Sequence, residues 1–256
     1  MSAPTASVDP PFKIKVVPLL VAVGLTLAVV VGATSLAFLS ARLFHTALPQ
    51  QSLVKWLFVQ HTFMLALGLL AIAILKYRFV PADYGLHWPH GKTYIGPAIL
   101  TGVVFGGLMT LVDYAPQLLA HNFTHAGWPP GYPLQKASLW HWVAFDLYVG
   151  PSEEIPTRSL LVTYLAATMP GKLRLGRFSM NGAGIVVAVI FALLHATSFF
   201  VVSWPQALGQ QIYAFVLAVI YAYWLEKSQS IAAAAIGHSV GDLVEQLIAF
   251  ACMGLL

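Results

Sequence analysis

Six of the nine acidic residues in this sequence lie inside long apolar stretches, where an ionised side chain is costly. An intramembrane charge costs about 2.5–3.5 kcal/mol on insertion scales, so each such group needs a partner, a proton or water. We therefore expect these side chains to face one another or a hydrated cavity, and not lipid. They are Asp113, Asp146, Glu153, Glu154, Asp242 and Glu245.

The first cluster is the segment Glu153-Glu154-Ile155-Pro156-Thr157-Arg158. Glu154 and Arg158 are four residues apart, so they share one face of a helix and can form an ion pair. Glu153 lies about 100° further round the helix and can face a different cavity wall. A clamp that only joins helices would explain Glu154 but not Glu153. The pattern favours Glu153 as a general base and Glu154–Arg158 as a structural pair.

Two histidines stand on later apolar stretches. Phe191 and His195 are four apart, so the phenyl ring can pack beside the imidazole and orient it. His238 and Asp242 are also four apart, and with Glu245 they form one polar stripe. Taken alone, each histidine is explained as well by a structural hydrogen bond.

Together, the three clusters carry the groups that peptide hydrolysis requires. A glutamate and a histidine can hold and deprotonate a water, here Glu153 and His195. A second histidine with a carboxylate, here His238 and Asp242, can stabilise an oxyanion or bind a metal. Asp146 lies seven residues before Glu153, on roughly the same face, and is interpreted as a supporting residue. Phe191 and Glu245 are interpreted in the same way.

The sequence leaves open whether a metal takes part in the reaction. Glu153, His195 and His238 would suit zinc as ligands, yet no H-E-x-x-H helix is present, so metal and glutamate-activated water both stay open. The single cysteine, Cys252, excludes a multi-cysteine metal site. His61, beside Gln60, is interpreted as an ordinary buried histidine.

Composition predicts the elements that must position these residues. The 256 residues are 59% hydrophobic and only 9% charged, with a mean hydropathy of +0.78, which excludes a soluble domain. We predict an all-α transmembrane bundle in one domain, residues 1–256, with a catalytic core at 139–250, and no strand pattern of period two. A loop rich in proline and glycine is expected at His121–Gln135. The seven predicted spans are Val16–Leu39, Leu53–Leu75, Ile95–Leu119, Leu139–Met169, Gly182–Ser203, Ala207–Leu225 and Ile231–Leu256.

The cations predict the orientation. Nine Lys and Arg fall on one side of the predicted spans and three on the other, which favours a cytoplasmic N-terminus. The protein is expected in a bacterial inner or plasma membrane, or in the ER membrane if the source is eukaryotic. The scattered cations give no support to nucleic acid as a partner. The expected partners are the lipid bilayer and a membrane-embedded protein or peptide.

Glu153-Glu154-x-x-x-Arg158, Phe191-x-x-x-His195 and His238-x-x-x-Asp242, in this order, resemble the signature of the CPBP intramembrane proteases. That family contains CAAX prenyl endopeptidases and bacterial proteins linked to bacteriocin processing or self-immunity. The resemblance implies that Glu153 and His195 activate water, while His238 and Asp242 line the oxyanion side or help to hold a metal. Asp242 departs from the asparagine of the prenyl-protein branch, so a prenylated and a leader-type substrate both stay open.

Two further functions compete with proteolysis. Intramembrane carboxylates also bind protons in ion-coupled transporters, but this sequence shows no internal repeat of the kind that transporters often carry. A non-catalytic scaffold or immunity protein would keep the family fold without turnover.

Overall fold

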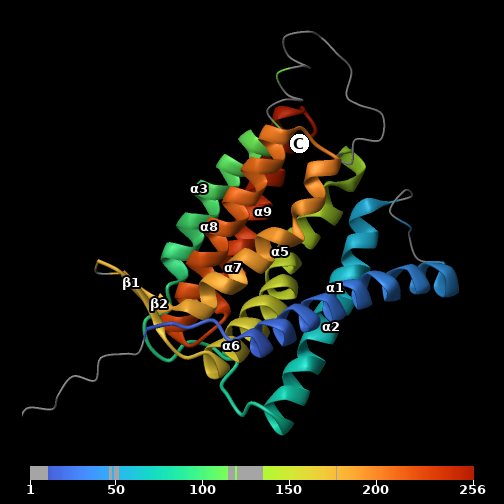
Figure 1. Cartoon of the computed structure of the whole chain (residues 1–256). Coiled ribbons are helices and arrows are strands. Elements are labelled where there is room, and N and C mark those ends of the chain that lie inside the picture. Colours follow the sequence, from blue (N-terminus) through green and yellow to red (C-terminus); the bar gives the residue numbers. More distant parts are fainter. Residues whose placement is uncertain (1–10, 46–47, 49–51, 115–118, 120–134, 177) are drawn as a thin grey trace, which may run out of the picture.

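The computed structural model describes residues 11–45, 48, 52–114, 119, 135–176 and 178–256, and most of them are helical (Figure 1). The loop predicted at His121–Gln135 lies outside the described residues except for Gln135. The long helices are α1 (Val16–Phe44), α2 (Leu53–Arg78), α3 (Ile95–Asp113), α5 (Leu139–Glu154), α7 (Gly182–Leu194), α8 (Trp204–Ser228) and α9 (Ala232–Cys252). The shorter helical elements are η1 (Lys136–Ser138), η2 (Ile155–Val162), α6 (Thr163–Thr168) and η3 (Ala196–Phe200).

Five helical segments in the described part of the chain are long and apolar enough to cross a membrane. They are Val16–Phe44, Leu53–Arg78, Ile95–Asp113, Gly182–Phe200 and Trp204–Ser228. The prediction of an all-helical membrane protein is confirmed, whereas two of the seven predicted spans do not meet this criterion. The fourth predicted span is divided among α5, η2 and α6. The seventh corresponds to α9, whose apolar character is reduced by His238, Asp242 and Glu245.

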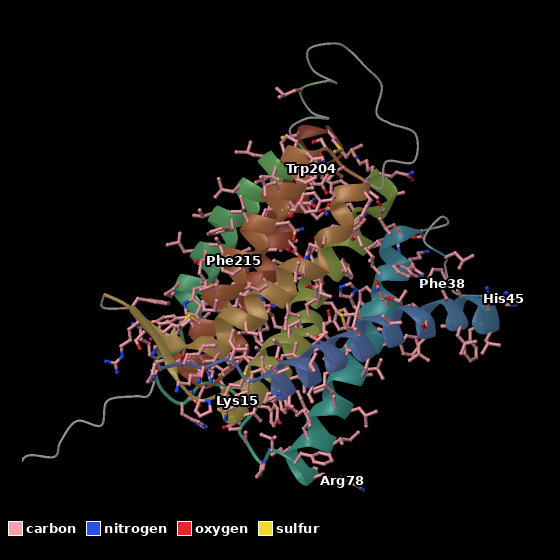
Figure 2. The ribbon with its side chains drawn as sticks, in the orientation of Figure 1. Lys15, Phe38, His45, Arg78, Trp204 and Phe215 are labelled. Atoms are coloured by element: carbon pink, nitrogen blue, oxygen red, sulfur yellow. The ribbon has the colours of Figure 1, made fainter. Side chains whose placement is uncertain are left out.

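The helices form a bundle with a separate pair against it. Helices α3, α8 and α9 pack side by side, α5 packs on α9, and α7 packs on α8 (Figure 1). Helix α1 crosses α2 at a steep angle, and α2 contacts both α5 and η2. Apolar side chains such as Leu100 and Leu111 on α3 are more than 60% exposed, as expected for a surface that faces lipid. Figure 2 shows Lys15 and Arg78 toward one end of the molecule and Trp204 toward the opposite end.

Glycines allow α9 to lie between α3 and α5 at very short range. A Cβ on Gly102 would lie 2.7 Å from the Gly237 carbonyl oxygen, and a Cβ on Gly106 would lie 2.5 Å from that of Gly241. On the other side, a Cβ on Gly150 of α5 would lie 2.1 Å from the Ala235 carbonyl oxygen. Small residues spaced in this way let helix backbones touch. The close contact brings the polar stripe of α9 next to the end of α5.

The predicted span Leu139–Met169 is not a single α-helix. The chain stays helical, but the eight residues of η2 form a π-helix directly after Glu154. Pro156 stands at the start of this segment and has no N–H to donate, so an α-helical bond is missing there in any case. Single wide turns of this kind are frequent at functional sites. Pro156 and the π-helix thus follow directly after the two adjacent glutamates.

A two-stranded antiparallel hairpin, β1 (Lys172–Leu175) and β2 (Phe178–Asn181), lies between α6 and α7 and was not predicted. The backbone N–H of Asn181 donates to the Glu226 carboxylate at 2.5 Å, and Lys227 Nζ donates to the Ser179 carbonyl at 3.0 Å. The hairpin is thereby attached to the last turns of α8. Four-residue strands are too short for alternation to be recognised in a sequence.

We expect Gly106→Ala to separate α3 from α9, because the new Cβ meets a backbone oxygen that cannot rotate away. The free energy of unfolding should fall by about 1–3 kcal/mol, the usual cost of overpacking. Gly107→Ala is the matched control, since a Cβ there has no neighbour within 4 Å. Thermal unfolding in detergent measures both variants. Equal midpoints would contradict the close contact.

Candidate active site

Two cavities meet at Glu153. The smaller, of about 210 Å³, is lined by polar groups from α5 and α9, including Asp146, His238 and Asp242. The larger, of about 370 Å³, is lined mainly by apolar side chains of α1, α2, η2 and α7. Glu153 and His195 line both cavities. The structure thus brings together the three motifs that the sequence places on separate helices.

The two carboxylate oxygens of Glu153 have different neighbours. Oε1 lies 3.0 Å from His61 Nε2, which is a hydrogen bond between α2 and α5. Oε2 lies 3.8 Å from His238 Nε2, a distance that leaves it without a direct bond to that ring. Glu153 is the only one of the two adjacent glutamates that reaches the larger cavity. The side chain of Glu153 is 21% exposed, whereas that of Glu154 is fully buried.

The predicted pair of Glu154 and Arg158 is present, and it includes a third member. Arg158 Nη1 lies 3.0 Å from Glu154 Oε1, and both side chains have zero exposure. His238 Nδ1 lies 2.8 Å from the same oxygen. His238 therefore belongs to the structural pair as well as to the cavity. Its Nε2 lies 3.7 Å from Asp242 Oδ2, so its expected partnership with Asp242 is the looser of the two contacts.

Phe191 supports more than the one histidine expected from the sequence. Its ring centroid lies 5.0 Å from that of His195 and 6.3 Å from that of His238. The Arg158 guanidinium carbon lies 4.0 Å from the same ring centroid, which is cation–π geometry. Nε and Nη2 of Arg158 have no hydrogen-bond partner in the described residues. The aromatic face thus compensates part of the buried charge.

His195 follows the last residue of α7 and lies between that helix and η3, within the predicted span Gly182–Ser203. Its Nδ1 is 3.0 Å from the Phe191 carbonyl oxygen, which can only accept a hydrogen bond. Nδ1 therefore carries the hydrogen, and Nε2 is left with a lone pair. Because His195 lines both cavities, that lone pair is available to a bound water.

The remaining acidic residues divide into two groups. Asp146, Asp242 and Glu245 all line the smaller cavity, as the supporting roles of Asp146 and Glu245 require. Asp146 is 2% exposed, and its Oδ2 has no hydrogen-bond partner among the described residues. Asp113 is not among the residues that line either cavity. Its carboxylate accepts hydrogen bonds from Gln210 at 2.6 Å and Tyr213 at 2.8 Å, so it joins α3 to α8.

His61 is the site residue that sequence reasoning missed. Its own helix offers no carboxylate, so its spacing pattern contains no signal of a partner. The contact with Glu153 joins residues 92 positions apart and arises only when α2 packs on α5 and η2. The interpretation of His61 as an ordinary buried histidine agrees with its burial and its bond to the Leu57 carbonyl, but it omits the contact with Glu153.

The zinc hypothesis finds no support in the arrangement. Glu153, His195 and His238 are suitable donors by type, but in the described residues no three His, Cys, Asp or Glu side chains are placed to hold a metal ion. Glu154 bonds one nitrogen of His238, the Phe191 carbonyl bonds one of His195, and His61 bonds one oxygen of Glu153, so one atom of each of the three residues stays free for water or substrate.

We expect Arg158→Met to destabilise the protein strongly, because it leaves Glu154 buried with only His238 as a partner. Breaking a buried ion pair on one side costs about 3–5 kcal/mol. Lys227→Gln is the control, since that lysine pairs with Glu226 at the partly exposed end of α8 and such pairs contribute about 0–1 kcal/mol. Denaturation of the purified variants measures both. A similar loss of unfolding free energy in the two variants would show that the buried ion pair stabilises the protein no more than the exposed one.

Comparison with known proteins gives one match. Residues 135–244 match the family model described as Rce1-like, type II CAAX prenyl endopeptidase. No curated protein and no solved structure matches the chain. The matched segment contains all three motifs, from Glu153 to Asp242, and it agrees with the resemblance to the CPBP family. Residues 135–244, less than half of the chain, are therefore similar to the domain of Rce1-like type II CAAX prenyl endopeptidases.

Proposed function

We propose that this protein is an endopeptidase that hydrolyses a peptide bond of a membrane-associated protein or peptide, with Glu153 as the general base. The observation that carries the proposal is the position of Glu153 where the apolar and the polar cavity meet. A substrate chain can approach through the apolar cavity, and water can reach the carboxylate through the polar one. His195 and His238 line the polar cavity beside it.

In the proposed reaction, Glu153 Oε2 takes a proton from a water that also donates to His195 Nε2. The water oxygen forms a bond to the scissile carbonyl carbon, and the carbonyl oxygen becomes an oxyanion. His238 acts as an imidazolium: Glu154 accepts its Nδ1–H and keeps the ring from turning away, and its Nε2–H donates to that oxyanion. Glu153 then gives its proton to the amide nitrogen as the carbon–nitrogen bond breaks.

The larger cavity supports an apolar feature in the substrate. Helices α1 and α2 form part of its wall, with Leu25, Val29 and Met64. A prenylated or leader-type peptide that lies in the bilayer would present such a feature. We propose that the end with Lys15 and Arg78 faces the cytoplasm, because cytoplasmic loops carry the excess of cations (Figure 2).

We expect Glu153→Gln to lose proteolysis by a factor of about 10²–10⁴, the usual contribution of a general base. The amide has the same shape, so the unfolding midpoint should change little. Glu226→Gln, the same substitution at the end of α8 and outside both cavities, should cleave normally. The measurement uses purified protein in liposomes with a library of prenylated and unmodified membrane peptides, and product masses give the cleaved bond.

Three outcomes would contradict the proposal. Normal cleavage by Glu153→Gln would show that another group is the base. No cleavage by the wild-type protein on any peptide would favour a non-catalytic scaffold. Loss of cleavage with 1,10-phenanthroline and its return with zinc would show that a metal activates the water.

A further inference from the structure

We propose that His61 of α2 is a positioning residue of the catalytic site, one that shares a single proton with Glu153 and reserves one carboxylate oxygen. The inference rests on the proposed function of Glu153 as the base. His61 lies outside the segment 135–244 that carries the family match. The site is therefore completed by a helix that the matched segment does not contain.

The His61 ring is held on two sides. Its Nδ1 lies 2.9 Å from the Leu57 carbonyl oxygen, one turn earlier on α2. Its ring stands perpendicular to that of Phe145, with the centroids 4.9 Å apart. The residue is 7% exposed, so water has little access to the ring. These contacts fix the direction in which Nε2 points.

The hydrogen-bond partners determine how many protons the pair holds. A carbonyl oxygen only accepts, so Nδ1 of His61 carries a hydrogen. If the ring were neutral and Glu153 ionised, two lone pairs would face each other across the 3.0 Å between Nε2 and Oε1. One further proton must therefore lie between these atoms. Oε1 is occupied by this bond, and Oε2 is the atom left to accept a proton from water.

The packing of α2 sets this contact. Gly68 lies seven residues after His61, hence on the same helix face. A Cβ on Gly68 would lie 2.9 Å from Pro156 Cβ, so the glycine allows α2 to touch the start of η2. Gln60 Nε2 donates to Thr34 Oγ1 at 2.9 Å and attaches α2 to α1. The turn of α2 at Gly68 is thus placed against the segment that follows Glu153, and the turn at Gln60 is attached to α1.

The kinetic test compares His61→Leu, His61→Gln and Thr62→Ala. His61→Leu removes the donor, so we expect kcat to fall by about 10–100-fold with KM changed less than about threefold. His61→Gln retains a donor at a similar distance and should recover most of that loss. Thr62 lies on the exposed side of α2, outside both cavities, and its variant should behave as the wild type. A wild-type kcat in His61→Leu would overturn the inference.

The second readout is the ¹⁵N NMR spectrum of histidine-labelled protein, which needs no substrate. We expect a hydrogen-bonded proton at His61 Nε2 in the wild type and in Thr62→Ala, and its loss in Glu153→Gln. An unchanged Nε2 signal in Glu153→Gln would also overturn the inference. If the wild type cleaves nothing, the proposed function is wrong, and the spectrum still decides whether the proton pair exists.

Discussion

A buried charge in a lipid-surrounded helix needs compensation from another part of the protein, and the rest of this structure depends on how Arg158 obtains it. Glu154 lies on the same helical segment, His238 comes from α9, and Phe191 comes from α7. Each of these helices is held to the others because leaving the guanidinium alone would cost several kcal/mol. The position of Glu153 follows, since it is the residue next to Glu154 at the end of α5. The chemistry of one glutamate thus depends on the ion pair of its neighbour.

Such compensation works only if the helices can come close. The hydrogen bond from His238 to Glu154 is 2.8 Å long, and α9 reaches α5 through Gly150, where a side chain would collide with the Ala235 carbonyl. Ser239 Oγ donates to the Leu147 carbonyl beside this point, at 3.1 Å. Gly68 has the same function on α2, toward Pro156. The small residues and the charged residues therefore depend on each other, since short contacts between charged side chains require short distances between the helix backbones.

The sequence predicts what lies within one helix far better than what lies between helices. The four-residue spacing was sufficient to predict the Glu154–Arg158 ion pair. The helical period was sufficient to predict that Glu153 points to a different face. The contacts of His238 with Glu154 and of His61 with Glu153 join residues 84 and 92 positions apart, and no local pattern contains them. The end of α7 at Leu194 also had no signal, because neither glycine nor proline follows it. The π-helix after Glu154 depends on tertiary packing that a periodicity does not describe.

The proposed mechanism assigns different functions to the Nε2 atoms of His195 and His238: the first accepts a hydrogen bond from water, and the second donates one to the oxyanion. The surroundings of the two rings support this assignment. The smaller cavity is lined by the carboxyl groups of Asp146, Asp242 and Glu245, which would repel a tetrahedral oxyanion wherever they are ionised. The donor is therefore not a carboxylate, and the proposed mechanism assigns this function to a nitrogen. His195 Nε2 carries the lone pair that the water needs, which leaves His238 Nε2, with Glu153 and Asp242 oxygens 3.8 and 3.7 Å away. Those two distances are too long for direct bonds, so in the proposed mechanism the N–H stays available to the oxyanion. In this arrangement Glu153, Glu154 and Asp242 surround His238 with acceptor oxygens. The His238 ring supplies the hydrogen-bond donor that an ionised carboxylate cannot supply.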